Sequence, residues 1–277
     1  MSTLRLQHLF ALLFAVALMV VADVAGAQEV KVEILWLGQS AFRIKTPGGK
    51  VIVTDPWLIN NPKSPQQYKD LDALGHVDLV LASHAHGDHF EDAPALLKKN
   101  NAKLVAPQGL QSQVISLGLV PAELAYRMGK GGTAQAIGGN IKISMVHPDH
   151  DSELTWTDPE TKKRTTYAGG EPVGYIIELE NGIKIYDMGD TGVFSDLKHI
   201  GEHYKPDLLL IPIGGHFVMN PREAAMVTRE YIKPKFAIPM HYGNTPQLAG
   251  TPKEYIDALG QAPTKVFTMN RGDKLEV

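Results

Sequence analysis

The sequence predicts an α/β protein, a four-layered αββα sandwich in one domain, and two observations support this fold class. Each half of the chain begins with strand-like runs and then alternates between strand and helix patterns. Two similar halves of this kind bury their apolar faces when the sheets pack together and the helices cover the outer faces. The chain has 277 residues, 44% hydrophobic and with no Cys, so a sizeable core is available while disulfides and thiolate metal ligands are excluded.

The chain opens with a pattern typical of export. Residues 9–21 are an uninterrupted apolar run, which is short for a bilayer span and typical of a signal peptide. Small residues at 25–27, Ala-Gly-Ala, fit a cleavage site, so Gln28 is the expected mature start. We therefore expect a signal peptide over residues 1–27, a mature domain over 28–277, and a periplasmic or secreted location. An uncleaved anchor helix is the alternative.

The first half of the mature chain starts with β-rich runs. Residues 30–44 and 50–54 flank a Pro-Gly-Gly turn and predict a hairpin. Residues 77–82 are a short, continuous apolar run, as expected of a strand buried on both faces. Alternating apolar spacings then predict, in order, a helix around 93–97, a strand at 102–106, a helix around 110–117 and a strand at 141–146.

Residues 151–172 interrupt this alternation, since they are polar and rich in turn-forming residues, and they predict a long loop that shapes the substrate pocket. Residues 175–179 and 183–186 flank Asn181-Gly182 and predict a second hairpin. The remaining patterns predict a helix at 195–204, a strand at 208–213, a helix at 221–232, a strand at 236–240, a helix at 252–259 and a strand at 265–269.

The most informative segment follows the buried strand and reads Ser-His-Ala-His-Gly-Asp-His. In an extended segment, residues i and i+2 point the same way, so His84 and His86 can face one metal ion. A turn at Gly87 then lets Asp88 and His89 face a second. Nitrogen and oxygen ligands suit zinc, and also manganese or iron. The alternative is a polar loop with scattered His, which is improbable because the chain has only 11 His.

This motif resembles the signature of the metallo-β-lactamase superfamily, His-x-His-x-Asp-His after a strand. Within that superfamily, the chain is similar to the metal-dependent hydrolases of the ascorbate-6-phosphate lactonase branch. The resemblance covers nearly the whole mature chain and implies the metallo-β-lactamase fold. It rests on the stretches 37–42, 55–56, 189–194, 212–217 and 238–242.

The resemblance implies three further metal ligands. The third His of the family pattern is expected at His150, with His147 as the alternative, because similar sequences carry the ligand just before a Ser-rich turn. The shared carboxylate is expected at Asp190, with Asp187 as the rival, and the last ligand at His241.

Two divalent metal ions are thereby implied, with zinc first and manganese or iron as alternatives. The first is expected on His84, His86 and His150, the second on Asp88, His89 and His241, and Asp190 between them.

Other polar residues have less specific expected roles. His216, at another strand end, is expected to line the site as a hydrogen-bond donor in catalysis, and Asp88 to orient the attacking water. Asp55 is expected to hold the active-site loops rather than to bind metal. His199 and His203 are four residues apart on a helix without a third ligand nearby, so a surface or packing role is expected.

The implied activity is that of a hydrolase which activates water with a dinuclear metal site, acting on a lactone or ester. A phosphodiester hydrolase is the alternative, because two-metal sites also serve in-line displacement. A non-catalytic metal-binding protein is a third reading, disfavoured by the complete ligand set. A β-lactamase is disfavoured because the lactamases of this superfamily lack the shared Asp, and some use a Cys.

The expected partner is a small-molecule substrate. With a net charge of −3 and no polybasic run, nucleic-acid binding is not expected. Neither is a stable membrane anchor, and a homo-oligomer is left open.

Overall fold

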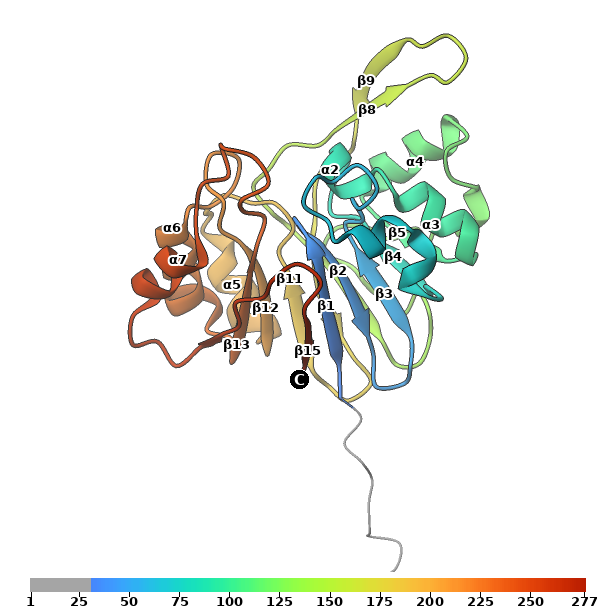
Figure 1. Cartoon of the computed structure of the whole chain (residues 1–277). Coiled ribbons are helices and arrows are strands. Elements are labelled where there is room, and N and C mark those ends of the chain that lie inside the picture. The colour runs from blue at the N-terminus through green and yellow to red at the C-terminus, as the bar shows by residue number, and fades with distance from the viewer. Residues whose placement is uncertain (1–30) are drawn as a thin grey trace, which may run out of the picture. The chain divides into compact units, whose positions relative to one another are not determined.

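The computed structural model describes residues 31–277, so the predicted signal peptide lies outside the described residues. Two mixed β-sheets pack face to face, and helices cover the outer face of each (Figure 1). The αββα sandwich predicted from the sequence is confirmed. Within residues 31–277, none of the helices has the length and apolar character needed to cross a membrane.

The first sheet comes mainly from the N-terminal half. Its inner strands β1 to β3 are antiparallel neighbours, and β3, β4 and β5 are parallel. The predicted first run is broken at residues 39–40, so it forms two strands instead of one. In sheet order the strands are β15 (Lys274–Glu276), β1 (Glu33–Gly38), β2 (Ala41–Lys45), β3 (Val51–Thr54), β4 (Leu79–Leu81) and β5 (Lys103–Val105).

The second sheet comes from the rest of the chain. Its strands β11 to β14 are parallel, whereas β10 pairs antiparallel with both β7 and β11, which confirms the second predicted hairpin. In sheet order the strands are β14 (Lys265–Val266), β13 (Phe236–Met240), β12 (Leu208–Pro212), β11 (Lys184–Asp187), β10 (Gly174–Glu178), β7 (Lys142–Val146) and β6 (Thr133–Ala134).

Helices fill the crossovers between parallel strands. Two of them begin with a reciprocal capping box, at Asn220 and at Thr251, which satisfies backbone groups at the helix start. The predicted helix at 221–232 is regular to Met226 and continues as a wider π-helical turn. The helices are η1 (Gln66–Lys69), η2 (Leu71–Leu74), α2 (Gly87–Phe90), α3 (Ala93–Asn100), α4 (Gln108–Ser116), η3 (Ala122–Leu124), α5 (Asp196–Tyr204), α6 (Pro221–Met226), η4 (Val227–Ile232) and α7 (Pro252–Leu259).

Strand alternation divides the apolar residues among three cores. In β1, Ile34 and Trp36 face the core between the sheets, while Leu35 and Leu37 face the helices of the first half. The hydroxyl of Tyr175 on β10 donates to the carbonyls of Ala82 and Val105, at 2.8 and 3.0 Å. These bonds tie the second sheet to the first at the ends of β4 and β5, where the His-rich segment begins.

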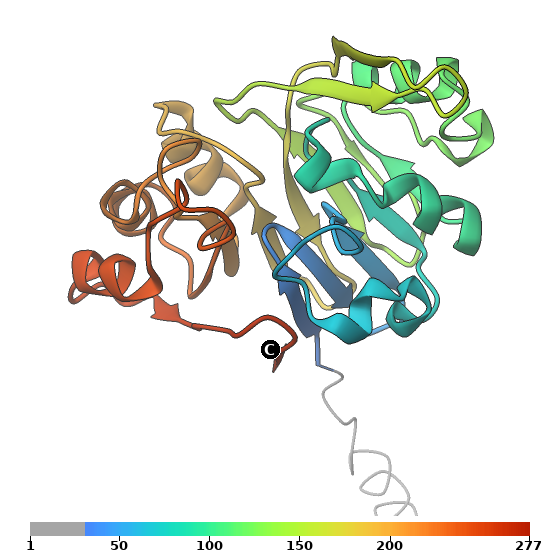
Figure 2. The same ribbon diagram turned by 45° about the horizontal axis from the view of Figure 1, so that its top comes forward.

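The predicted long loop at 151–172 is wrong in one respect, because this segment folds into an antiparallel hairpin. Strands β8 (Glu153–Thr157) and β9 (Arg164–Ala168) pair in register, with Trp156 opposite Thr165. Leu154 is buried in the first core, and Tyr167 packs against that core. The alternation of apolar and polar residues in β8 carried this signal, but the polar composition of the segment concealed it. The hairpin lies near α2 and α4 (Figures 1 and 2).

Candidate metal centre

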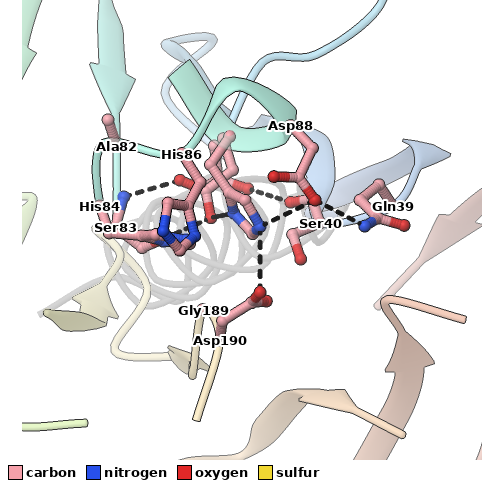
Figure 3. A network of polar contacts seen from close by, with 12 residues as sticks. Gln39, Ser40, Ala82, Ser83, His84, His86, Asp88, Gly189 and Asp190 are labelled. Atoms are coloured by element: carbon pink, nitrogen blue, oxygen red, sulfur yellow. Dashed lines mark hydrogen bonds and ion pairs between the residues drawn. The ribbon is translucent and has the colours of Figure 1, made fainter. Parts of the chain in front are cut away.

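The residues of the His-rich segment are positioned by a change from extended backbone to helix. His86 has φ −60° and ψ 147°, and the single-turn helix α2 begins at the next residue. His84 and His86 therefore lie on the extended part, as predicted, while Asp88 and His89 project from the helical turn. Figure 3 shows the side chains of His84, His86, Asp88 and Asp190 converging from these segments and from the end of β11.

The first ligand group consists of His84, His86 and His150, whose donor atoms lie within 4.8 Å of one another. Nε2 of His84 is 3.0 Å from Nδ1 of His86, and the His150 ring centroid is 5.0 Å from that of His84. His147 is exposed instead, and its ring meets Phe194 edge-on. The structure thus brings His150, and not His147, to this group.

The second ligand group consists of Asp88, His89 and His241, and a third group, His84, His89 and Asp190, overlaps it. Oδ2 of Asp190 lies 2.9 Å from Nε2 of His241, 3.3 Å from Nε2 of His89 and 3.6 Å from Nε2 of His150. Asp190 therefore lies between the two metal positions that the sequence predicts.

Asp187, the alternative candidate for the shared carboxylate, is buried at the end of β11, before the turn that leads to Asp190. Its Oδ1 accepts a hydrogen bond from the backbone nitrogen of Gly189, and it belongs to none of the three groups. Its position at the end of β11 holds the turn that carries Asp190.

Two buried ligand atoms without hydrogen-bond partners indicate that these residues fit metal ions. Nε2 of His89 and Oδ1 of Asp190 are buried without a hydrogen-bond partner. Buried polar atoms in folded proteins almost always have one, so a cluster of unpaired donor atoms is typical of a site that binds an ion. Imidazole nitrogens and carboxylate oxygens are the donors that zinc, manganese and iron accept. The residues therefore fit divalent cations.

The charge states of Asp190 and His84 also favour a bound cation. Burial alone would raise the pKa of Asp190, but His241 and His89 hold it well below its usual range, so the carboxylate is ionised. Burial lowers the pKa of His84 well below its usual value, aided by the neighbouring His89. His84 is therefore neutral, which is the form of imidazole that binds a metal.

Buried residues behind the ligands fix the orientation of two rings. Oδ2 of Asp55 lies 2.8 Å from Nδ1 of His89 and accepts from the Ser83 hydroxyl at 2.7 Å. That hydroxyl lies 2.9 Å from Nδ1 of His84. A carboxylate or hydroxyl on the outer nitrogen of a ligating His sets the tautomer and presents the other nitrogen to the metal. Asp55 thus supports the centre, as expected from the sequence.

Gln39 was missed as a site residue by the sequence analysis. Its Nε2 lies 2.8 Å from Oδ2 of Asp88 and 2.8 Å from Nε2 of His241, and Figure 3 shows it reaching Asp88 from the opposite side of the cluster. Its Oε1 is buried and unpartnered. The only signal was its place in the first stretch that matched the family, to which no role was assigned.

Strained backbone also gathers at this centre. Gln39, Asp55 and His241 have φ values of +50°, +41° and +53°, in the left-handed region that side chains rarely occupy. Such conformations persist where the surrounding structure enforces them, most often at functional sites. Here they direct three buried side chains inward from turns that follow strands.

His216 lies in an exposed turn with φ +60°, edge-on to the ring of Phe217. The backbone nitrogen of Met219 donates to the carbonyl of Thr191 at 3.0 Å, so this turn lies against the loop that follows Asp190. His216 is not a member of the three groups. Its catalytic role stays a prediction.

Known proteins resemble this chain in sequence and in fold. A model of the beta-lactamase superfamily domain matches residues 33–241. A UPF0173 metal-dependent hydrolase of Cupriavidus metallidurans is 56% identical over 247 residues, covering 88% of this chain and 85% of that protein. A second one, of Polaromonas sp., is 55% identical over 246 residues, covering 89% and 90%. Igni18, a metallo hydrolase from the archaeon Ignicoccus hospitalis, is 29% identical with a TM-score of 0.77, covering 89% of this chain and 98% of that one.

Proposed function

The chain belongs to the metallo-β-lactamase superfamily and is a metal-dependent hydrolase, and from this premise we propose that its substrates are small molecules, namely lactones or esters. We propose further that it uses two divalent ions, zinc first, on the seven residues of the three overlapping groups. One observation supports a dinuclear centre above all: His89 belongs to two of the groups, and Asp190 lies between the two metal positions.

The proposed reaction adds water to the carbonyl carbon and releases the alcohol oxygen. Bound divalent ions would supply water activated at neutral pH and would stabilise negative charge on the carbonyl oxygen. Asp88 has a side chain that is 32% exposed, in contrast to Asp190 at 4%, so it is the carboxylate that substrate reaches. Asp88 would orient the attacking water, and the proton that this water loses would pass to the leaving alcohol oxygen as its bond to the carbonyl carbon breaks.

Gln39 and Asp190 would hold this arrangement during the reaction. The amide of Gln39 donates to Oδ2 of Asp88 and so fixes the direction of that carboxylate. Asp190, ionised and buried, would keep the positive charge of the centre in balance. His216 would donate a hydrogen bond to the developing oxyanion from its turn beside the loop after Asp190.

The residues that line the pocket beside the metal centre favour an uncharged substrate over a phosphodiester. A pocket beside Asp88 is lined also by Glu91, and its described lining contains no Lys, Arg or His. Sites that bind anionic phosphate esters ordinarily add Arg or Lys to their metal ions to balance the charge. A neutral ester or lactone needs no such cation.

Turnover of three substrate types by the zinc-loaded and the manganese-loaded protein tests the proposal. We expect hydrolysis of γ-lactones and p-nitrophenyl esters, and much slower hydrolysis of bis-p-nitrophenyl phosphate. His84→Ala is the control, since loss of a proposed ligand should abolish any metal-dependent rate. Faster turnover of the phosphodiester would assign the alternative activity. Turnover of none of the three, by protein with full metal content, would contradict the lactone and ester assignment.

A further inference from the structure

A cavity of about 640 Å³ adjoins the metal centre at Asp88, on the side of the β8–β9 hairpin. Its volume lies within the range of small-molecule sites in proteins. Its walls are mainly apolar and aromatic, with Trp57, Phe90, Leu119, Leu154 and Trp156. These residues come from three separate parts of the chain: the loop after β3, the segment from α2 to the loop after α4, and the hairpin.

The hairpin wall of this cavity is held at a fixed place relative to the metal ligands. The backbone nitrogen of Ala85 donates to the hydroxyl of Ser152 at 3.2 Å, and Nε2 of His86 lies 2.9 Å from Oε2 of Glu153. Directly after the paired strand β9, beside Ser152, a Cβ atom on Gly169 would overlap Ala85. Glycine is therefore required there for the hairpin to lie directly against the His-rich segment.

The burial of the lining residues separates structural from ligand-binding roles. Leu154 and Phe90 belong to the first core and are buried, so they form the floor of the cavity. Trp57 and Trp156 are only half-buried, and both line the cavity. Large aromatic side chains that a fold leaves part-exposed beside a reactive centre offer apolar area to a ligand.

The side chains that line the cavity favour one class of occupant. Its described lining includes two carboxylates, on Asp88 and Glu91, and no basic side chain. The walls therefore offer an anionic group no basic side chain to pair with, whereas an apolar group would gain from leaving water there.

We propose that this cavity, the hairpin pocket, binds an uncharged apolar acyl or aryl group of the substrate, while Asp88 at its edge faces the scissile carbonyl. The assignment rests on the proposed ester or lactone activity for the identity of the reacting group. It goes beyond that activity by specifying the substituent: a medium-length aliphatic chain or an aromatic ring, without charge.

Binding of neutral alkanamides tests the pocket without turnover. Amides from acetamide to octanamide would be titrated into metal-loaded protein, with Kd measured by NMR. Each added methylene should tighten binding by about threefold to fourfold until the pocket is filled. Trp156→Ala should flatten this dependence on chain length, and so should Trp57→Ala, because both side chains line the cavity. Ile256→Ala is the matched control, because Ile256 is an exposed apolar residue on the distant helix α7.

The same variants, assayed on methyl acetate and methyl hexanoate, separate the two proposals. The pocket predicts that Trp156→Ala lowers kcat/KM for the hexanoate at least tenfold and changes the acetate little, with metal content and circular dichroism as in the wild type. Chain-length-dependent amide binding without any ester turnover would overturn the ester activity and leave the pocket standing. Kd values independent of chain length, or unchanged in both Trp variants, would overturn the pocket.

Discussion

The side-chain nitrogen of Gln39 lies 2.8 Å from Oδ2 of Asp88, and so joins a turn of the first sheet to a proposed metal ligand 49 residues away. The same nitrogen lies 2.8 Å from Nε2 of His241, which reaches the centre from the second sheet. Gln39 thus contacts ligands from both halves of the molecule. Its backbone carbonyl also accepts from the His241 backbone nitrogen at 3.1 Å, so the two strained turns support each other.

Replacement of Gln39 by Met should weaken one of the two metal sites. Met keeps the length of the side chain and removes the amide that orients Asp88. Loss of an orienting partner of this kind typically costs about 10-fold to 100-fold in metal affinity. We expect one metal equivalent with reduced affinity and one unchanged, measured by chelator competition. Equal affinities in Gln39→Met and wild-type protein would show that Gln39 has no part in the centre.

Substitution of His150 and of His147 should have different effects on metal content. His150→Ala should remove about one metal equivalent or strongly weaken its binding, because His150 lies with His84 and His86. His147→Ala should leave the metal content unchanged, because His147 is exposed and contacts Phe194. Metal analysis of both purified variants decides the assignment, and the reverse result would place the ligand three positions earlier.

Metal affinity should rise with pH. Burial alone would lower the pKa of His241, but the Asp190 carboxylate raises it to about 9 in the metal-free protein. Below that pH the ring carries a proton, which must leave before the nitrogen can bind a cation. The apparent affinity is therefore lower at pH 6 than at pH 8. Chelator competition across this range, corrected for the protonation of the chelator, measures the effect, and a flat profile would contradict it.

Export is a separate prediction from the sequence. Protein purified from its native host should begin at Gln28, because residues 25–27 fit the cleavage rule. N-terminal sequencing gives the answer directly. A first residue within 1–10 would mean that the apolar run is retained.

The fold and most of the centre could be predicted because local chemistry determines them. Four of the ligands lie close together in the sequence, so the extended segment and the turn that carry them are enough to predict that they converge. They are His84, His86, Asp88 and His89. Asp190 and His241 could be placed only through the family resemblance, since no local pattern brings distant strand ends together. The structure assembles both with the His-rich segment.

The features that escaped prediction depend on tertiary contacts. The β8–β9 hairpin is polar outside and is anchored by Leu154 and by the close approach of Gly169 to Ala85, neither of which a window of sequence reveals. Strand β15 has three residues, too few for a recognisable alternation, and it forms because β1 offers it an edge. Gln39 contacts Asp88 and His241 only because the two halves pack together, so no local pattern predicts its role.

Replacement of Asp190 by Asn tests the dinuclear centre most directly. Asn keeps the size of the side chain but removes the negative charge that would offset repulsion between two neighbouring cations. The account predicts that Asp190→Asn retains the wild-type circular dichroism spectrum, binds one metal equivalent in place of two, and loses most hydrolytic activity. Two fully occupied sites with wild-type turnover, measured on the same preparation, would contradict it.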